Sequence, residues 1–398
     1  MSESLDVLVV GGGMVGSLFA LLLRQGAPAL NMMVIDSEVS VAPSADAPFS
    51  LRVSALNQSS EALIARAGCG EALAQMRQCR FTQMQVWDAD GTGQVHFSAG
   101  DIGTSHLGTL IENACVQALL AQALGPMLQC TRLQSLQRLA QGWQATLADG
   151  RVLHPALVVG ADGALSRVRE AAGIAVTTRD YGQQGLVCNV RTELPHEQTA
   201  WQRFLPEGPL AFLPLADPHQ CSIVWTLPND RAQTMMTADA DSFAQALGHA
   251  FESRLGAVSL LGARATFPLL ARHAERYSEP GLVLIGDAAH SIHPLAGQGV
   301  NLGLLDAAAL ADEMLAALAA GLPAHHERAL RRYSRARRGH NGLLMHSMSA
   351  FEWLFAQDAP IWRVLRNVGM RHFERSAFMK QAVMGVAMRP AGVHTSAQ

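Results

Sequence analysis

The feature that most constrains the fold is a glycine-rich stretch near the start of the chain. Residues 5–10 read LDVLVV, an apolar run typical of a buried parallel strand, and GGGMVG follows at 11–16 before an apolar helical pattern. A second run, MMVID, ends at Asp36, 20 residues after Gly16. The strand, the helix and the distal acid stand where a dinucleotide-binding βαβ unit requires them. A tight turn in an ordinary α/β sheet is the alternative reading of the glycines.

Each glycine of this stretch has its own predicted role. Gly11 allows a tight turn, Gly13 lets the backbone approach a pyrophosphate, and Gly16 lets the helix pack on the strand. We expect Asp36 to accept hydrogen bonds from the ribose hydroxyls of the nucleotide. These residues predict a Rossmann-like nucleotide site.

A second apolar strand ends within GLVLIGDAAHSIHPLAGQGVNLGLLDAA, at 281–308. Ligands of open parallel sheets lie at the carboxyl ends of the strands, so Gly286 and Asp287 should face the same ligand as the first glycines. A carboxylate there suits a chain of hydroxyl groups. The helix that starts near Asn301 should direct its N–H groups toward a phosphate or a developing anion.

The loop between this strand and this helix contains small residues. Pro294, Gly297 and Gly299 would let a flat ring lie against the backbone. A dinucleotide, a polyol chain and a flat ring together describe FAD, whereas NAD has no polyol for Asp287. FAD is therefore the predicted cofactor.

The segments between these motifs predict antiparallel strands. Alternating residues flank turns at Asp90-Gly91, Asp149-Gly150 and Asp217, and each pattern indicates a hairpin. The second hairpin leads into a strand that ends in Asp162-Gly163, a third glycine-rich strand end. A helix is expected over 240–256, a strand near 263–268, and helices from 301 almost to the end.

The expected fold class is α/β: a Rossmann-like FAD-binding domain is interrupted by a mainly antiparallel β-sheet substrate domain, and a C-terminal helical region follows. The expected boundaries are 1–75, 100–180 and 269–330 for the FAD-binding domain, 76–99 and 181–268 for the substrate domain, and 331–398 for the helical region.

Composition supports a folded protein of this size. At 398 residues the chain predicts two domains or one large interwoven unit, and 49% hydrophobic against 16% charged residues excludes disorder. A net charge of −3 provides no basic surface for nucleic acid. Six cysteines without metal-ligand spacing indicate buried, reduced thiols. The first residues lack a basic segment, so we expect no signal peptide, and no apolar run of about 18 residues occurs in the sequence. We therefore expect a cytoplasmic protein without a membrane span or a bound metal.

The chain resembles the class A flavoprotein aromatic hydroxylases of the p-hydroxybenzoate hydroxylase fold, which share the three glycine-rich strand ends. More narrowly, it is similar to the FAD-dependent hydroxylases of ubiquinone biosynthesis that act on polyprenylated phenols. The similarity extends from residue 5 to about 370. It is carried by LRVSALNQSSEALIARAG (51–68), LGTLIEN (107–113), LVVGADGALSRVR (157–169), AFLPLADPHQCSIVW (211–225) and GDAAHSIHPLAGQGVNLGLLDAAAL (286–310).

The resemblance implies the following FAD contacts. The three glycines of 11–16 hold the pyrophosphate, Asp36 holds the adenosine ribose, and Arg52 lies near the flavin and its phosphates. Asp287 binds the ribityl region, and Pro294 to Gly299 line the isoalloxazine. Many relatives carry an arginine near residue 110, where this chain has Glu112-Asn113. The full predicted cofactor set is Gly11, Gly13, Gly16, Asp36, Arg52, Asn113, Asp162, Gly163, Gly286, Asp287, Pro294, Gly297, Gly299 and Asn301.

The resemblance also implies the reaction. NAD(P)H, which has no domain of its own here, reduces the flavin and meets Asp162-Gly163. Reduced flavin and O2 then form a C4a-hydroperoxide that hydroxylates a phenol ring. Since the flavin carries the chemistry, we expect no side chain as essential acid or base. His290 and His293 are weak catalytic candidates, and a hydrogen-bonding scaffold role is the alternative.

Two further features concern the substrate. Five aromatic residues lie on predicted sheet strands, where core packing competes with substrate contact: Trp201, Phe204, Phe212, Trp225 and Phe267.

Arginines recur at helical spacing in the segment 328–357, at positions 328, 331, 332, 335 and 338. Such a segment can lie peripherally on the inner face of the cell membrane, near a prenylated substrate. A solvated helix face, whose apolar side closes the core or a dimer contact, is the alternative.

We therefore expect a polyprenylphenol-type substrate, O2 and NAD(P)H as reaction partners, and association with other ubiquinone-biosynthesis proteins. Three alternatives stay open on the sequence. They are a hydroxylase of a small soluble aromatic, a flavin-dependent isoprenoid reductase on the same fold, and a flavoprotein that only scaffolds other pathway proteins.

Overall fold

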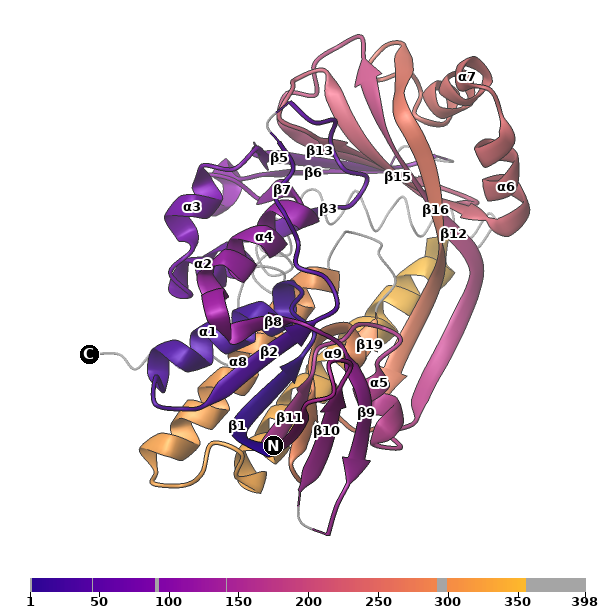
Figure 1. The fold of residues 1–398 in the computed structure, drawn as a ribbon. Coiled ribbons are helices and arrows are strands. Elements are labelled where there is room, and N and C mark those ends of the chain that lie inside the picture. The colour runs from indigo at the N-terminus through magenta and orange to yellow at the C-terminus, as the bar shows by residue number, and fades with distance from the viewer. Residues whose placement is uncertain (1, 45, 90–92, 141, 292–298, 356–398) are drawn as a thin grey trace.

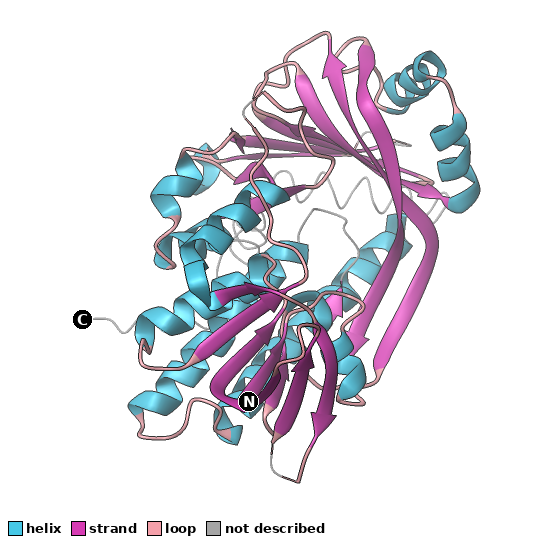
Figure 2. Ribbon diagram, in the orientation of Figure 1, coloured by secondary structure: helices cyan, strands magenta, loops and turns pink. Residues whose placement is uncertain are grey.

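The computed structural model describes residues 2–44, 46–89, 93–140, 142–291 and 299–355 (Figure 1). Within these residues the strands form two eight-stranded sheets and one three-stranded sheet. Figure 2 shows the two large sheets at opposite ends of the molecule, with most helices packed around the first. The mixed α/β fold class predicted from the sequence is confirmed.

The first sheet contains the predicted parallel strands, in the order β17-β18-β11-β1-β2-β8. The buried apolar runs explain these strands, since Leu8, Val9, Val158 and Val159 are fully buried. The pair β9 and β10 extends the sheet by antiparallel pairing onto β11. The strand bounds are β1 Ser2–Val10, β2 Met32–Asp36, β8 Leu128–Cys130, β9 Leu133–Arg138, β10 Trp143–Leu147, β11 Val152–Gly160, β17 Ser278–Glu279 and β18 Leu282–Leu284.

Helices cover this sheet and form the largest core with it. The helix α1 (Met14–Gly26) contacts α4 (Asn113–Leu124) and α8 (Gly299–Ala319), and α8 contacts α9 (Glu327–Phe355). The short helix α5 (Arg167–Ala171) follows β11. None of the helices in the described part of the chain is long and apolar enough to cross a membrane.

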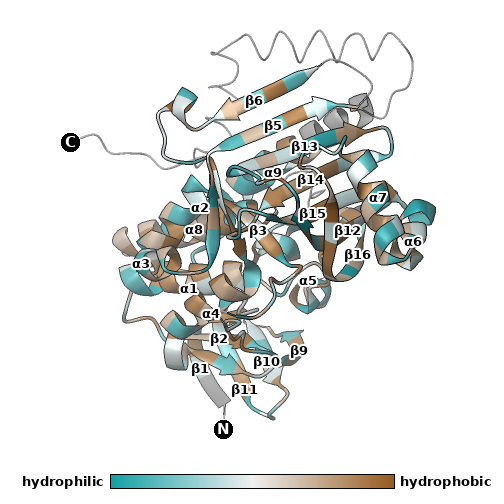
Figure 3. Cartoon of the chain, turned by 90° about the horizontal axis from the view of Figure 1, so that it is seen from above, coloured by the Kyte–Doolittle hydropathy of each residue, from teal (hydrophilic) through white to brown (hydrophobic). Residues whose placement is uncertain are grey.

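The second sheet is antiparallel except where β13 pairs with β5 in parallel. Its order is β19-β16-β12-β15-β14-β13-β5-β6. The outer helices α6 (Asn229–Thr237) and α7 (Ala240–Ala250) contact it, and Figure 3 shows their outer sides as mainly hydrophilic. The strand bounds are β5 Gln83–Asp88, β6 Gln94–Ser98, β12 Val176–Thr192, β13 Thr199–Leu205, β14 Gly208–Pro214, β15 Gln220–Pro228, β16 Val258–Ala274 and β19 His290–Ser291.

Two strands of 17 residues each, β12 and β16, link the ends of the molecule (Figure 1). The expectation of a strand near 263–268 was therefore too short, and the helix expected over 240–256 ends at Ala250. The pairing of β12 with β16 shifts register between Asp180 and Gln184, where Gly182 has a φ of 67°. Because these strands contain glycines and many half-exposed residues, they lack the regular alternation of apolar and polar residues that predicts a strand.

The expected hairpins are present. The strands β10 and β11 pair around Asp149-Gly150, β14 and β15 pair around Asp217, and β5 pairs with β6. The turn residues Asp90 and Gly91 lie outside the described residues.

A three-stranded sheet not expected from the sequence lies between the two large ones. Its order is β3-β7-β4, with the bounds Val53–Asn57, Gly108–Glu112 and Gln78–Phe81. It packs against Met84, Ala200 and Leu213 of the second sheet. The helices α2 (Gln58–Arg66) and α3 (Gly70–Ala74) connect β3 to β4.

The six cysteines are free thiols. Five are buried as predicted, but Cys130 is exposed because it ends β8, the last strand at one edge of the first sheet. Burial raises the pKa of Cys79 to about 11 and that of Cys188 to about 12, so these thiols stay protonated at neutral pH.

Candidate cofactor site

The first glycine turn is shaped by close backbone contacts. A Cβ added to Gly11, whose φ is 109°, would stand 2.3 Å from the carbonyl oxygen of Ala161, and one on Gly16 would stand 2.0 Å from that of Gly11. Both positions therefore require glycine for the fold. Gly13 differs, because a Cβ there would meet only the Nε2 atom of Gln117, at 3.9 Å. Contacts within the protein therefore do not require glycine at position 13, which leaves room for the predicted approach of a pyrophosphate.

Asp36, at the end of β2, orients this turn. Its Oδ2 atom accepts a hydrogen bond from the backbone N–H of Gly12 at 2.7 Å, and its Oδ1 atom accepts one from Glu38 at 3.1 Å. The carboxylate is half-buried, so a ligand can still reach it. Asp36 therefore has a structural role besides the predicted contact with ribose.

The second strand end lies beside the first turn of α1. A Cβ on Gly286 would stand 3.2 Å from the Cγ1 atom of Val15. A Cβ on Gly303, in α8, would stand 2.6 Å from the Cγ2 atom of Val15 and 3.4 Å from the Cα atom of Gly286. The two motifs, 275 residues apart from Gly11 to Gly286, are thus brought together by small residues at one crossing point.

Asp287 stands out at this point because its neighbours are buried and it is exposed. It makes no hydrogen bond or ion pair within the described part of the chain. Desolvation by the surrounding protein raises the pKa of its carboxyl, which nearby His290 opposes. A solvent-exposed carboxylate that has no partner among the described residues fits the hydroxyl groups of a ribityl chain.

The third strand end is joined to the second by a buried arginine. Arg169 donates to the carbonyl oxygens of Ala288 at 2.8 Å and Ala164 at 2.9 Å. Asp162 caps α5, because its Oδ1 accepts from the hydroxyl of Ser166 at 2.5 Å and its Oδ2 from the N–H of Arg167 at 2.8 Å. The carboxylate of Asp162 is thus used within the protein, and the half-buried turn at 162–163 remains open to a ligand.

Behind Gly286 lies a buried charge cluster that the sequence did not predict. Asp306 is fully buried, and its Oδ2 atom lies 2.5 Å from the Nε2 atom of His290 and 3.1 Å from the N–H of Gly286. Its Oδ1 atom accepts from the Nε atom of Arg337, in α9, at 2.6 Å. Desolvation raises the pKa of Asp306, but His290 and Arg337 outweigh it and lower that pKa to about 2. Asp306 is therefore a buried anion.

Tyrosines extend this cluster. The ring of Tyr277 stacks on His290 with 5.8 Å between centroids, and its hydroxyl lies 2.9 Å from the Nε2 atom of His273. The hydroxyl of Tyr333 donates to the carbonyl oxygen of Leu284, the last residue of β18, at 2.8 Å. Burial raises the pKa of both tyrosines, so their hydroxyls stay protonated donors.

These contacts bear on the two histidines that the sequence analysis named as weak catalytic candidates. His290 is 2% exposed and its Nε2 atom contacts Asp306, which fits the scaffold alternative rather than a catalytic base. His293, Pro294 and Gly297 lie outside the described residues.

Arg52 and Asn113 meet through their backbones. The N–H of Asn113 donates to the carbonyl oxygen of Arg52 at 3.0 Å, while the Arg52 side chain is exposed. The Oδ1 atom of Asn113 accepts from the hydroxyl of Ser54 at 2.7 Å. Glu112, which departs from the arginine of many relatives, is buried and pairs with Arg77 at 2.7 Å. It also accepts from the N–H at position 50 and so fixes the loop before Arg52.

Asn301 is used inside the protein. Its Oδ1 atom accepts from the hydroxyl of Ser60 at 2.7 Å and from the N–H of Asn57 at 3.1 Å, and its Nδ2 atom donates to Ala55 at 2.8 Å. Only its backbone remains available to a cofactor, at the start of α8. Gly299 precedes it, and a Cβ there would meet no described atom within 4 Å.

The aromatic residues of the second sheet divide between its faces. Trp201, Phe212 and Trp225 belong to the core around Phe251, and the rings of Phe212 and Phe251 stack with 3.7 Å between centroids. For these three the core-packing alternative is the one observed. Phe267 is 38% exposed and lies over Gly185, where a Cβ would stand 2.6 Å from its ring.

Phe267 lies on the face of the sheet that points away from α6 and α7. Leu186 belongs to the core under these helices, so its neighbours Gly185 and Val187 point to the opposite, inner face. Asn189 shares that face and donates to the carbonyl oxygen of Phe49 at 2.7 Å, in the loop before Arg52. The inner face is therefore tied to the cofactor side of the molecule.

Comparison with known proteins decides the family. Residues 4–346 match the family model described as "FAD binding domain". The chain belongs to this FAD-binding family. It is 35% identical to 3-demethoxyubiquinol 3-hydroxylase of Escherichia coli (strain K12), over 97% of this chain and 99% of that protein. It is 34% identical to ubiquinone hydroxylase UbiL of Rhodospirillum rubrum, over 96% of this chain and 89% of that protein.

The fold also agrees with a solved structure. p-Nitrophenol 4-monooxygenase PnpA from Pseudomonas putida DLL-E4 superposes with a TM-score of 0.77 at 20% identity, over 96% of this chain and 97% of that chain. The resemblance to FAD-dependent ubiquinone-biosynthesis hydroxylases is thus confirmed, and the protein is an FAD-dependent monooxygenase. The roles of single residues toward FAD remain predictions.

Proposed function

We propose that this monooxygenase hydroxylates the ring of a polyprenylated phenol in ubiquinone biosynthesis, with NAD(P)H and O2 as co-substrates. The main support is full-length similarity to two hydroxylases whose names state ubiquinone or its precursor. The observation in the fold that carries the proposal is the convergence of the turn at 11–16 with the exposed carboxylate of Asp287, which suits FAD.

The proposed cofactor contacts are assigned to groups that a ligand can reach. The turn at 11–16 holds the pyrophosphate, with Gly13 at closest approach, and Asp36 holds the adenosine ribose. Asp287 binds the ribityl hydroxyls, and the first turn of α8 directs its N–H groups to the flavin end. Bound FAD supplies the activation of O2 and the transfer of one oxygen atom to the ring.

The protein's part is to position the ring and exclude water. The inner face of the second sheet, around Phe267 and Val187, is the proposed wall of the substrate site. Apolar side chains there suit a phenol that carries a prenyl chain, and a dry site limits loss of oxygen as peroxide. His290 contributes by holding the end of β18 through Asp306 and not by moving a proton.

The helix α9 is the proposed membrane contact. Its arginines at 328, 331, 332, 335 and 338 are exposed, whereas Arg337 points inward to Asp306. Arg331 pairs with Glu327, and Arg332 lies 3.8 Å from Glu313. The other three have no ion pair with a described residue, which leaves them available to anionic lipid at the inner face of the cell membrane.

Labelled oxygen tests the proposed reaction. The purified flavoprotein is incubated with NAD(P)H, a prenylated phenol and isotopically labelled O2, and the product is weighed by mass spectrometry. We expect one labelled oxygen atom in the ring and faster NAD(P)H oxidation when the phenol is present. A product without label would reject the hydroxylase and favour the isoprenoid-reductase alternative.

A further inference from the structure

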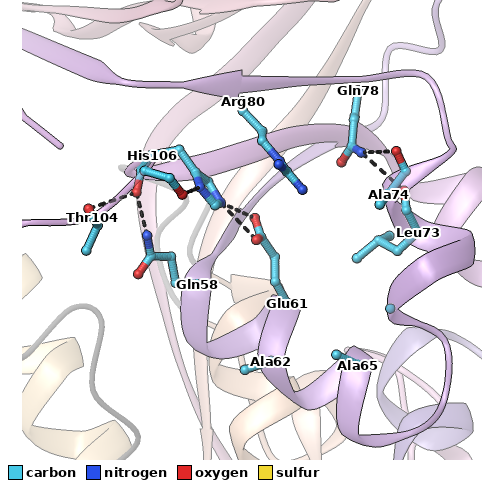
Figure 4. A pocket seen from close by; sticks show the side chains of 12 residues that line it. Gln58, Glu61, Ala62, Ala65, Leu73, Ala74, Gln78, Arg80, Thr104 and His106 are labelled. Carbon is cyan, nitrogen blue, oxygen red and sulfur yellow. Dashed lines mark hydrogen bonds and ion pairs between the residues drawn. The ribbon is translucent and has the colours of Figure 1, made fainter.

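A surface hollow of about 530 Å³ lies away from the cofactor site, between α2, α3 and the strand β4 (Figure 4). Its volume falls within the range of about 300–1,000 Å³ that small-molecule sites occupy. One side is apolar and is formed by three alanines and one leucine on the two helices, namely Ala62, Ala65, Leu73 and Ala74. This side offers a shallow apolar floor rather than a deep slot.

The opposite side of the hollow carries a free cation. Arg80, on β4, is exposed and extends over the hollow in Figure 4. It forms no ion pair with any residue that the structure describes. A free guanidinium beside an apolar floor is the combination that recognises a carboxylate with a hydrocarbon body.

The carboxylate among the residues that line the hollow, that of Glu61, already has a partner. Both oxygen atoms of Glu61 lie within hydrogen-bond distance of the Nε2 atom of His106, at 2.9 and 3.1 Å. The Nδ1 atom of His106 is 2.8 Å from the hydroxyl oxygen of Ser105, so both ring nitrogens have partners. The carboxylate of Glu61 therefore faces His106, and it forms no ion pair with Arg80.

The side-chain amides of the two glutamines that line the hollow also have partners within the protein. The Nε2 atom of Gln58 donates to the carbonyl oxygen of His106 at 2.6 Å. The Nε2 atom of Gln78 donates to the carbonyl oxygens of Leu73 and Ala74, at 3.2 and 3.0 Å. With these donors used inside the protein, Arg80 is the strongest remaining donor for a ligand.

We propose that this hollow binds a small organic carboxylate with a short hydrocarbon body. The carboxylate lies on the guanidinium of Arg80 and the hydrocarbon lies on the floor formed by α2 and α3. The site is separate from the cofactor contacts, but α2 connects the two. On its inner side Ser60 donates to Asn301 at the start of α8, so a ligand on α2 lies one helix away from the flavin end of the cofactor site.

Fluorine NMR tests the site directly. The probe is hexanoate whose terminal methyl group is trifluorinated, titrated into the FAD-loaded protein while its fluorine line width is followed. Arg80→Gln removes the ionic contact, and Ala62→Leu covers the floor. A hydrogen bond to a charged group contributes about 1.5–3 kcal/mol, so Arg80→Gln should weaken binding by roughly ten- to a hundred-fold. Ala62→Leu should abolish it.

Matched variants distinguish this site from other arginines and from the flavin site. Arg132→Gln removes an exposed arginine outside the hollow, and Ala72→Leu enlarges an exposed α3 alanine that does not line it. Both should bind the probe like the wild type, and flavin absorbance should be equal in all five proteins. Equal binding by wild type, Arg80→Gln and Ala62→Leu, or no broadening in the wild type, would overturn the proposal.

Discussion

Replacing Asp306 with asparagine should destabilise the protein strongly, although the two side chains have the same shape. The change leaves the guanidinium of Arg337 buried beside a neutral amide that cannot balance its charge, and it replaces the carboxylate that lies 2.5 Å from the Nε2 atom of His290. Removal of one partner from a buried ion pair costs about 3–5 kcal/mol, a large part of the 5–15 kcal/mol that typically separates folded from unfolded proteins. The same change weakens the contact to the N–H of Gly286, so FAD retention should fall as well.

The measurement is the free energy of unfolding in urea, with and without added FAD. Asp312→Asn on the same helix is the matched control, because Asp312 forms an exposed pair with Arg66 and should contribute about 0–1 kcal/mol. Adding Arg337→Met to Asp306→Asn removes the unbalanced cation, so the double variant should be less destabilised than the sum of the single changes. A cost for Asp306→Asn equal to that of Asp312→Asn would refute the assigned role of the cluster.

The same residue predicts a pH dependence. The pKa of Asp306 is about 2 in the folded protein and about 3.9 in an unfolded chain. Because the folded value is depressed, its stabilisation is fully present above about pH 4 and is lost as the pH falls toward 2, a change of about 2–3 kcal/mol. Asp306→Asn should flatten this part of the stability profile. Profiles of equal slope would show that other carboxylates cause the acid unfolding.

Three further predictions concern ligands. Asp287→Ala should lower FAD affinity by roughly ten- to a hundred-fold with an unchanged unfolding midpoint of the apoprotein; full flavin content after dialysis would contradict it. Gly13→Ala should weaken FAD without destabilising the apoprotein, whereas Gly16→Ala should destabilise it, because its Cβ meets a backbone oxygen. The reverse order would contradict the placement of the pyrophosphate. Co-sedimentation with anionic vesicles should fall for a variant with glutamine at Arg328, Arg335 and Arg338, and should not fall for one with glutamine at Arg132, Arg138 and Arg276. Equal loss in both variants would show only a general effect of charge.

Several features could be predicted from the sequence because they depend on neighbouring residues. A strand that ends in glycines, a helix that starts on them and an acid 20 residues later are local patterns. The hairpins at Asp149-Gly150 and Asp217 follow from turn chemistry in the same way. These patterns were sufficient to predict the α/β fold class and FAD as the cofactor, whereas the family was predicted from resemblance to known hydroxylases.

The long strands and the three-stranded sheet needed the tertiary structure. In β16, buried and exposed residues do not alternate regularly, because the strand extends between both ends of the molecule and much of it is half-exposed. The strand β3 pairs with β7, more than 50 residues away, and nothing in either segment alone specifies that partner. Such pairings depend on which apolar faces meet once the chain has collapsed.

The sequence by itself determined which residues stand at the strand ends, because a dinucleotide turn limits the residue types that a few adjacent positions can hold. Only the tertiary structure decided how those ends are held. Arg169 reaches Ala288 across 119 residues, and Asp306 meets Arg337 across 31. It also decided that Asp162 and Asn301 satisfy their side chains inside the protein, while Asp287 has no partner among the described residues. The physical reason is that a buried charge or amide takes whichever partner the packing of distant elements brings within hydrogen-bond distance.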